Sequence, residues 1–260
     1  MTILDEIAGY ARERVKKQKE IKSLEEIRFE AAMFQKKGFA FEEALKKDGI
    51  SFICECKKAS PSKGIIAEQF PYADIALDYE KAGADAISVL TEPKWFLGRD
   101  EYLSEISSLV KIPCLRKEFV VDEYMVYEAA VLGASAVLLI CSILSVEEIK
   151  RYLKICDGLG LSALVEAHDE EEVKKAITAG ARIIGVNNRN LKDFSVDTEN
   201  SKRLRTLIPS DILFVSESGV KGPEDVKAIK DMGADAVLVG ETLMRAADKS
   251  LKLKELKSLL

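Results

Sequence analysis

Short apolar, β-branched runs alternate with amphipathic helical stretches after residue 50, and this alternation restricts the fold more than any other feature. Successive runs start 20 to 34 residues apart, the length that a strand, a helix and two loops require. Such units predict a parallel sheet, and eight of them in 260 residues predict a (β/α)8 TIM barrel, with an open doubly wound sheet as the less favoured alternative. The runs are FICEC from Phe52, AISVLTE from Ala86, CLRKEF from Cys114, AVLLI from Ala136, ALVEAH from Ala163, IIGVNN from Ile183, ILFVSES from Ile212 and AVLVGE from Ala236.

An internal repeat supports the barrel. The segments KAGADAISVL, VLGASAVLLI, TAGARIIGVN and DMGADAVLVG each join a helix end to a strand through a glycine. These glycines, at positions 83, 133, 180 and 233, are 50, 47 and 53 residues apart, so they mark every second strand. The regularity predicts four pairs of strand–helix units, which an open sheet does not require.

The first 50 residues are expected to form helices rather than strands. Ser23 and Glu26 have the spacing of a capping box at the start of one helix. We therefore predict one domain over residues 1–260, with a helical extension at 1–50 and the barrel at 51–260. The extension is expected to cover the rim of the barrel mouth.

Charge and composition exclude several classes of function. The net charge is −5 and no basic face or tail stands out, so we expect no nucleic-acid partner. No apolar stretch is long enough to span a bilayer, and no signal peptide is recognisable, which predicts a cytoplasmic protein without a membrane partner. The five cysteines accompany a single histidine, His168, so buried thiols are favoured over a metal site at Cys54 and Cys56.

Ionisable residues stand where the predicted strands end, which is where barrel enzymes carry their active sites. Glu55 and Lys57 share one face of the first strand, and Cys54 and Cys56 share the other. Because unpaired charges are costly against apolar helices, Glu55 and Lys57 are expected to point into the barrel mouth. Further candidates end the later strands: Lys117, Glu166, Asn187, Arg189, Glu217 and Ser218. A buried ion-pair cluster without catalytic function is the alternative, but so many charges at strand ends favour a catalytic site.

Glycines and aromatic residues near the same ends suggest the kind of ligand. Gly219 and Gly240 follow the last two strands, where backbone N–H groups commonly hold a phosphate. Phe96 and Phe119 follow the second and third strands and are suited to wall a flat apolar ring. A phosphorylated small molecule with an aromatic part is the expected ligand.

Seven motifs in this order resemble the indole-3-glycerol-phosphate synthase family over nearly the whole chain: ECKKASPSKG, LTEPKWFLG, LRKEFVVD, LVEAHDEEE, IGVNNRNL, VSESGV and LVGETLMR. The resemblance implies an enzyme of tryptophan biosynthesis that closes the indole ring of 1-(2-carboxyphenylamino)-1-deoxyribulose 5-phosphate. The products are indole-3-glycerol phosphate, CO2 and water. The resemblance also implies that no metal or organic cofactor is used.

Roles carried over from the resemblance are assigned position by position. Lys117 corresponds to the general acid, Glu166 to its carboxylate partner, and Lys57 to a second essential lysine that Glu55 orients. Asn187 corresponds to the amide that holds a substrate hydroxyl, and Ser218 with Gly219 and Gly240 lies near the phosphate. Phe96 and Phe119 correspond to the aromatic wall, Arg189 to a substrate-binding residue, and Glu217 to the neighbour of Ser218. Ser60 and Ser62 lie in a segment that corresponds to a mobile loop of the family. This loop is expected to close over the substrate.

Three positions depart from the family pattern. Glu118 stands where the family usually has Asp, a change that is tolerable if its side chain faces the helices and costs rate if it touches the site. Met125 replaces an expected polar residue. Glu241 replaces a frequent serine, and because a carboxylate repels phosphate its side chain is expected to turn away.

Two other functions fit the same residues. A Schiff-base aldolase also needs a lysine beside a glutamate inside a barrel, with Lys117 or Lys57 forming the imine. A non-catalytic barrel that senses a phosphorylated ligand is the other, although the complete set of ionisable residues disfavours it. A monomer or weak homodimer is expected.

Overall fold

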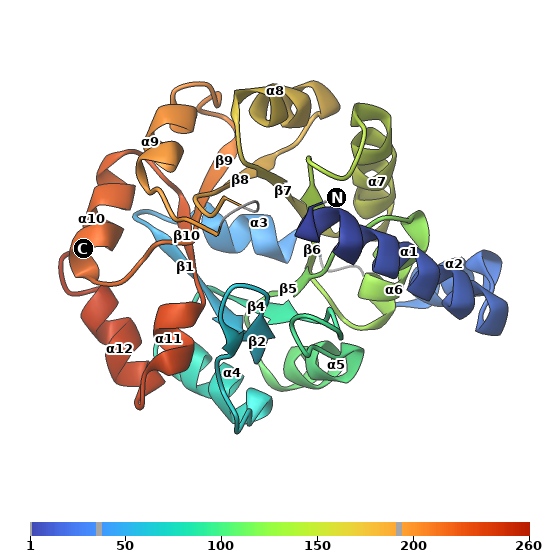
Figure 1. The fold of residues 1–260 in the computed structure, drawn as a ribbon, viewed down its shortest axis with the longest axis horizontal. Helices are drawn as coiled ribbons and strands as arrows, with labels where there is room; N and C mark the ends of the chain where they lie inside the picture. The colour runs from blue at the N-terminus through green and yellow to red at the C-terminus, as the bar shows by residue number, and fades with distance from the viewer. Residues whose placement is uncertain (1, 35–37, 191–193) are drawn as a thin grey trace.

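The computed structural model describes residues 2–34, 38–190 and 194–260, and it contains a closed barrel of parallel strands (Figure 1). Around the barrel the order is β1-β10-β9-β8-β7-β6-β5-β4, and every neighbouring pair is parallel. Closure confirms the TIM barrel and excludes the open sheet. Each barrel strand begins within one residue of its predicted start: β1 (Ser51–Cys56), β4 (Ala86–Leu90), β5 (Cys114–Lys117), β6 (Ala136–Ile140), β7 (Ser162–Ala167), β8 (Ile183–Asn187), β9 (Leu213–Glu217) and β10 (Ala236–Val239).

Helices cover the outside of the barrel, and several begin with side-chain caps. Ser145 and Glu148 form a capping box, and Asp122 and Asp169 accept backbone N–H groups at two other helix starts. The repeated glycines at 83, 133, 180 and 233 all adopt left-handed φ between 82° and 88°, which explains why glycine recurs before every second strand. The helices are α4 (Tyr72–Lys81), α5 (Asp100–Leu109), α6 (Glu123–Val131), α7 (Val146–Leu159), α8 (Glu170–Ala179), α9 (Glu199–Arg205), α10 (Pro223–Asp231), α11 (Glu241–Arg245) and α12 (Lys249–Leu256).

Buried apolar residues form two cores, one inside the barrel and one between the strands and the helices. The inner core includes Ile53, Leu115 and Leu164. Cys54 and Cys56 belong to the outer core, as strand alternation predicted, and burial raises the pKa of both thiols. These cysteines are therefore packing residues rather than reactive groups.

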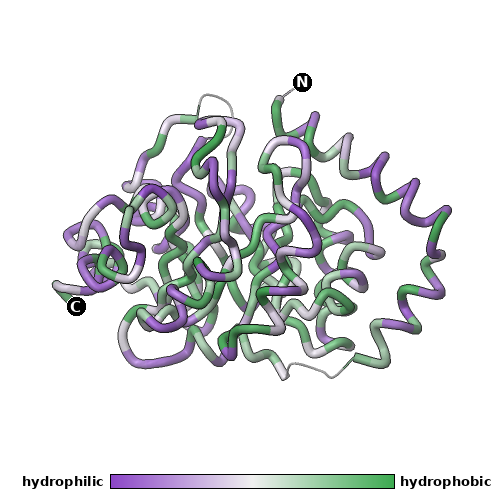
Figure 2. The backbone as a smooth tube through the Cα atoms, turned by 90° about the horizontal axis from the view of Figure 1, so that it is seen from below, coloured by the Kyte–Doolittle hydropathy of each residue, from purple (hydrophilic) through white to green (hydrophobic). Residues whose placement is uncertain are grey.

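The helical extension runs along one side of the barrel from one end to the other (Figure 2). Residues of α1 (Ile3–Ile21) line the mouth, and α2 (Leu24–Met33) packs on α6. In contrast, α3 (Ala40–Leu45) closes the opposite end, where Phe41 and Leu45 enter the inner core. The expectation that the extension covers the mouth is right for α1 and wrong for α3. The predicted capping box of Ser23 and Glu26 is present.

The segment after β1 folds into a small antiparallel hairpin of β2 (Ala59–Ser60) and β3 (Gly64–Ile65) beside the mouth (Figure 1). Ser60 is buried, and its Oγ lies 3.4 Å from Ser62 Oγ. Within the described residues, every helix is too short or too polar to cross a membrane.

Candidate active site

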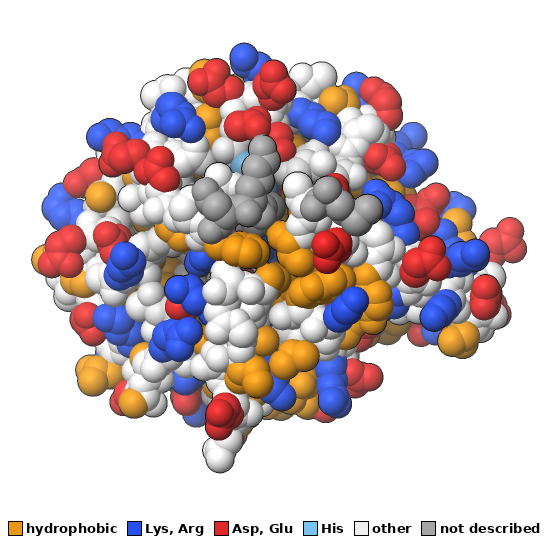
Figure 3. Space-filling model, in the orientation of Figure 1, with side chains coloured by type: hydrophobic (Ala, Val, Ile, Leu, Met, Phe, Trp, Pro, Cys, Tyr) orange, Lys and Arg blue, Asp and Glu red, His pale blue; other side chains and the backbone are white. Residues whose placement is uncertain are grey.

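A cavity of about 460 Å³ opens at the carboxyl ends of the barrel strands. On this face of the molecule, apolar side chains gather near the centre and charged side chains surround them (Figure 3). Every residue that the sequence analysis assigned to the site lines the cavity. These residues are Glu55, Lys57, Ser60, Phe96, Lys117, Phe119, Glu166, Asn187, Arg189, Glu217, Ser218, Gly219 and Gly240.

Lys117 is the charged centre of the cavity floor. Its Nζ lies 2.8 Å from Glu166 Oε2 and 3.0 Å from Glu217 Oε2, and its side chain is only 12% exposed. Burial disfavours the ammonium, but the carboxylates of Glu166, Glu217 and Glu55 outweigh burial and raise the pKa of Lys117. Lys117 is therefore held protonated.

The four charges come from alternate barrel strands: Glu55 from β1, Lys117 from β5, Glu166 from β7 and Glu217 from β9. TIM barrels fill their interior with layers of side chains that alternate strands contribute. Below this level the inner layers are apolar, with residues such as Leu115 and Leu164. The ionisable residues thus occupy the layer next to the cavity.

Glu166 and Glu217 differ in protonation although both contact Lys117. Burial opposes the charge of Glu166, but Lys117 and His168 outweigh it and lower its pKa, so Glu166 is ionised. Burial and the nearby Glu166 charge outweigh Lys117 at Glu217 and raise its pKa to about 7. Glu217 Oε1 is buried, has no hydrogen-bond partner among the residues that the structure describes, and lies against Gly185, where a Cβ would be 2.2 Å away. One carboxylate is therefore available as a base while the other readily holds a proton.

Glu55 and Lys57 form an ion pair of 2.5 Å on the inner side of the mouth, as predicted. The pair lies against Gly240, where a Cβ would be 2.3 Å from Glu55 Oε1 and 3.0 Å from Lys57 Nζ. Glycine at 240 therefore leaves the room that the ion pair occupies.

Asn187 and Ser218 connect the ends of β8 and β9. Ser218 Oγ donates to Asn187 Oδ1 over 2.9 Å, and the Asn187 side chain also hydrogen-bonds Glu166. Ser218 and Gly219 both have positive φ, 67° and 101°, which turns this segment sharply after β9. Glycine adopts such angles freely, but Ser218 is strained, and strained backbone of this kind is common where a loop is shaped for a ligand.

Three cations surround Glu241 at the end of β10. Its Oε1 lies 3.0 Å from Arg245 Nε and 3.7 Å from Lys63 Nζ, and its Oε2 lies 3.8 Å from Arg189 Nη2. All four residues line the cavity. The expectation that Glu241 turns away is wrong, because its carboxylate faces the cations at the mouth.

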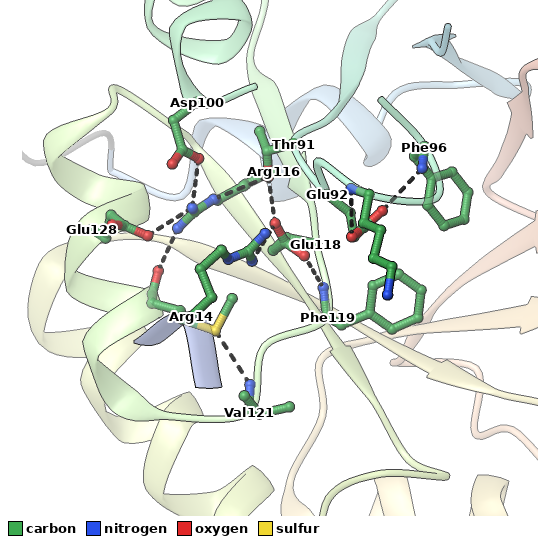
Figure 4. A network of polar contacts seen from close by, with 12 residues as sticks. Arg14, Thr91, Glu92, Phe96, Asp100, Arg116, Glu118, Phe119, Val121 and Glu128 are labelled. Carbon is green, nitrogen blue, oxygen red and sulfur yellow. Dashed lines mark hydrogen bonds and ion pairs between the residues drawn. The ribbon is translucent and has the colours of Figure 1, made fainter. Parts of the chain in front are cut away.

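Buried carboxylates hold the aromatic wall in place (Figure 4). Phe96 and Phe119 have ring centroids 5.9 Å apart. The carboxylate of Glu92 accepts the backbone N–H of Phe96, and that of Glu118 accepts the N–H of Phe119. Glu118 also pairs with Arg14 of α1 over 2.8 Å, so this departure from the family pattern links the helical extension to the site.

Arg116 anchors the outer side of β5 beneath this network (Figure 4). Its fully buried guanidinium pairs with Asp100 and Glu128, both over 2.7 Å, and donates to the carbonyl of Met125. Met125 Sδ accepts the N–H of Val121, so a thioether takes the place of the expected polar group. The arrangement is structural and fixes the turn that follows Lys117.

Several residues at the site escaped the sequence analysis. His168 lies 3.4 Å from Glu166, and Arg14, Lys63 and Arg245 bring additional charges. The position of His168, two residues after Glu166 and four before Glu172, was the available signal. Among the described residues no group of three or more His, Cys, Asp or Glu side chains is arranged to hold a metal ion.

Comparison with known proteins identifies close relatives of this chain. A family model described as indole-3-glycerol phosphate synthase matches residues 4–256. The chain is 58% identical to indole-3-glycerol phosphate synthase of Ruminiclostridium cellulolyticum, over 98% of both chains. It is 54% identical to the protein of that name from Endomicrobium trichonymphae, over 98% of this chain and 99% of the relative.

A solved structure with low sequence identity shares the fold alone. Thiamine phosphate pyrophosphorylase from Pyrococcus furiosus superposes with a TM-score of 0.61 at 16% identity, covering 81% of this chain and 94% of that chain.

Proposed function

Since the chain belongs to the indole-3-glycerol phosphate synthase family, we propose that Lys117 and Glu166 are the acid and base of its reaction. The protein is a decarboxylating lyase of tryptophan biosynthesis that acts on a phosphorylated small molecule. It converts 1-(2-carboxyphenylamino)-1-deoxyribulose 5-phosphate to indole-3-glycerol phosphate, CO2 and water. The observation that carries the assignment of roles is the buried contact of 2.8 Å between Lys117 and Glu166 on the cavity floor.

Ring closure requires an acid at the ribulose carbonyl. Lys117, kept protonated by three carboxylates, gives its proton to the carbonyl oxygen while the aryl carbon attacks the carbonyl carbon. Loss of CO2 then restores the aromatic ring. In the dehydration that follows, the hydroxyl leaves as water, and ionised Glu166 accepts the proton that the intermediate loses. Lys57, paired with Glu55, is the second acid and assists this departure.

The two ends of the cavity suit the two ends of the substrate. Ser218, Gly219 and Gly240 offer hydroxyl and backbone donors to the phosphate, with Arg189 nearby. Phe96 and Phe119 pack against the anthranilate ring at the other end. Asn187 and Glu217 lie between them and position the hydroxyl-bearing carbon chain, while Ser60 and its hairpin border the opening.

The charge state of Lys117 weighs against a Schiff-base aldolase that uses this residue. An imine-forming lysine needs a neutral amine, which proteins obtain by lowering the lysine pKa. Here the neighbouring carboxylates raise the pKa of Lys117. Borohydride treatment with the carbonyl substrate should accordingly leave both Lys117 and Lys57 unmodified.

We further propose that the enzyme works in the cytoplasm, without a cofactor, as a monomer or weak homodimer. Its five cysteines are all free and buried, as is usual in a reducing compartment. Light scattering over a range of protein concentrations tests the oligomeric state, and a stable higher oligomer would contradict it. Turnover after exhaustive dialysis against a chelator tests the cofactor expectation.

Replacing the base tests the proposed roles. Glu166→Gln keeps the shape of the side chain and should reduce kcat by about 10²–10⁴, the range typical of a positioned acid or base. Glu147→Gln, an exposed change on α7, serves as the control and should leave turnover unchanged. Wild-type kcat in Glu166→Gln would remove Glu166 from the mechanism.

A further inference from the structure

The turn after β9 has a conformation that its own sequence disfavours. Ser218 has a φ of 67°, in the left-handed region where serine is uncommon, and Gly219 follows with a φ of 101°. A Cβ on Gly219 would lie 2.6 Å from Thr198 Cγ2, so the turn also passes close to the start of α9. Contacts from outside the turn are therefore needed to hold Ser218 in this shape.

The side chain of Asn188, the residue directly after β8, supplies such a contact. Its Nδ2 donates to the carbonyl oxygen of Ser218 over 3.1 Å and to Ser216 Oγ over 3.2 Å. Its Oδ1 accepts the backbone N–H of Ser201 over 3.0 Å and the Ser201 hydroxyl over 2.8 Å. These four bonds use every donor and acceptor position of the amide. Asn188 thus ties together β8, β9 and α9, which are neighbours in the fold (Figure 1).

The network around Asn188 is closed and excludes water. The residue is only 3% exposed, and Ser201 and Ser216 are fully buried. Ser216 Oγ lies 2.9 Å from Ser201 Oγ, so the three side chains hydrogen-bond in a ring. Because a buried polar group that loses its partner is costly, the ring holds the Asn188 amide in one place.

Only one orientation of the Asn188 amide fits its partners. The backbone N–H of Ser201 can only donate, so the amide oxygen faces α9. The carbonyl of Ser218 can only accept, so the amide nitrogen faces the turn. The exchanged orientation would set donor against donor and oxygen against oxygen. The amide donor is therefore aimed at the Ser218 carbonyl.

The contact with Asn188 also sets the direction of the Gly219 N–H. The Ser218 carbonyl and the Gly219 N–H belong to one planar trans peptide group, in which they point in opposite directions. Because the carbonyl points to Asn188, the N–H points away from it. Ser218 and Gly219 line the cavity and Asn188 does not, so this N–H is directed to the cavity side.

We propose that Asn188 is a positioning residue, which holds the peptide group between Ser218 and Gly219 so that its N–H meets the substrate phosphate. Asn188 acts through the turn and does not touch the substrate. The affinity for phosphate thus depends on a buried residue outside the cavity. The inference rests on the proposed placement of the phosphate at Ser218, Gly219 and Gly240.

Asn188→Ala removes the donor, and competitive inhibition by two fragments of the substrate measures the effect at each end of the site. Without the hydrogen bond Ser218 leaves its left-handed conformation, and the inhibition constant of inorganic phosphate should rise about tenfold. Anthranilate contains the aromatic end of the substrate without the phosphate, and its inhibition constant should stay within about twofold of wild type. KM should rise about tenfold, while kcat changes by less than about threefold.

Ser201→Ala is the matched control within the same network. It removes a fully buried hydroxyl, but it keeps the backbone N–H that orients the amide and the contact between Asn188 and the Ser218 carbonyl. In urea denaturation this variant should be less stable than the wild type. Its inhibition constant for inorganic phosphate should nevertheless equal the wild-type value.

Ser218→Gly tests whether the conformation of Ser218 is the link. Glycine adopts the left-handed φ without strain, so the turn depends less on Asn188. In this background, Asn188→Ala should raise the inhibition constant of phosphate by only about threefold, instead of about tenfold. Asn188→Asp is a second variant that keeps the shape of the side chain. When ionised it sets an oxygen against the Ser218 carbonyl, and it should weaken phosphate binding as Asn188→Ala does.

The outcomes separate positioning from a purely structural role. An unchanged inhibition constant of phosphate in both Asn188 variants, or an equal rise for phosphate and anthranilate, would overturn the inference. An equal loss of phosphate affinity in Ser201→Ala would do the same. If inorganic phosphate failed to compete with the substrate even in the wild type, the proposed placement of the phosphate would fail first, and the inference would fall with it.

Discussion

Lys117 Nζ lies 2.8 Å from Glu166 Oε2, although the two residues are 49 positions apart in the chain and come from different strands. The contact exists because the barrel brings its odd-numbered strands to one interior layer. Glu217 completes the arrangement at 3.0 Å from the same ammonium. A protonated lysine, an ionised carboxylate and a carboxyl that readily holds a proton thus share one cavity floor.

Glu217→Gln should reveal the protonation of Glu217 as a pH-dependent difference in stability. The folded protein binds this proton more tightly than the unfolded chain does, because the pKa of Glu217 is raised to about 7. Wild-type stability from this group is therefore present below the ordinary glutamate pKa and is lost as the pH rises to about 7. Relative to wild type, the variant should gain on the order of 1–3 kcal/mol in unfolding free energy between pH 5 and pH 8.

Urea denaturation at these two pH values measures that difference. Glu224→Gln, an exposed change on α10, controls for general charge effects. Its difference from wild type in unfolding free energy should be the same at both pH values. A difference that stays constant or reverses with pH would mean that Glu217 is ionised throughout.

Arg14→Met should weaken both the fold and substrate binding. The substitution leaves the buried carboxylate of Glu118 without its ion-pair partner of 2.8 Å, a loss of about 2 kcal/mol in unfolding free energy. Glu118 also holds the N–H of Phe119, so KM should rise more than kcat falls.

The matched control for this change is Arg12→Met, which alters an exposed arginine of the same helix. Combining Arg14→Met with Glu118→Gln should recover part of the lost stability, because the buried charge is then removed as well. Additive losses in the double variant would contradict the coupling.

Glu241→Gln should tighten binding of the phosphorylated substrate. In the wild type the Glu241 carboxylate neutralises cations at the mouth, including Lys63 and Arg245. With a neutral amide at this position, the same cations would attract the substrate phosphate more strongly. Removing one nearby charge at the water-filled mouth changes binding by on the order of 1 kcal/mol, or about fivefold in KM. Steady-state kinetics at low and high salt measure the effect, which should shrink as salt rises. A higher KM in the variant would show that Glu241 positions these cations instead.

Gly240→Ala should damage the site through a single methyl group. Its Cβ would lie 2.3 Å from Glu55 Oε1, so the Glu55–Lys57 pair must move. We expect kcat/KM to fall by at least about tenfold, as misplacement of catalytic groups typically causes. Gly158→Ala is the control, because its Cβ meets nothing within 4 Å in helix α7. Full activity in Gly240→Ala would show that the ion pair tolerates displacement.

The barrel strands and the site residues were predictable because each depends on short segments. Periodic apolar runs mark the strands, and parallel strands in a barrel must bring their carboxyl ends together. Lys117 and Glu166 could therefore be placed in one mouth without knowledge of any contact.

The remaining features depend on contacts between distant segments, which one sequence does not specify. The apolar face of α3 gives no sign that Phe41 and Leu45 enter the closed end of the barrel. The pairing of Arg14 with Glu118 joins segments that share no local pattern. Glu241 was misplaced because its repulsion of phosphate was considered without the cations that surround it.

Indole fluorescence tests the central claim most directly. Purified wild-type protein and Lys117→Ala are mixed with 1-(2-carboxyphenylamino)-1-deoxyribulose 5-phosphate, and circular dichroism confirms that both are folded. The wild type should produce a growing indole signal, and the variant should be slower by roughly 10³-fold or more, since it lacks the residue proposed to protonate the carbonyl. Equal signals from both proteins would contradict the account and assign the acid role to Lys57.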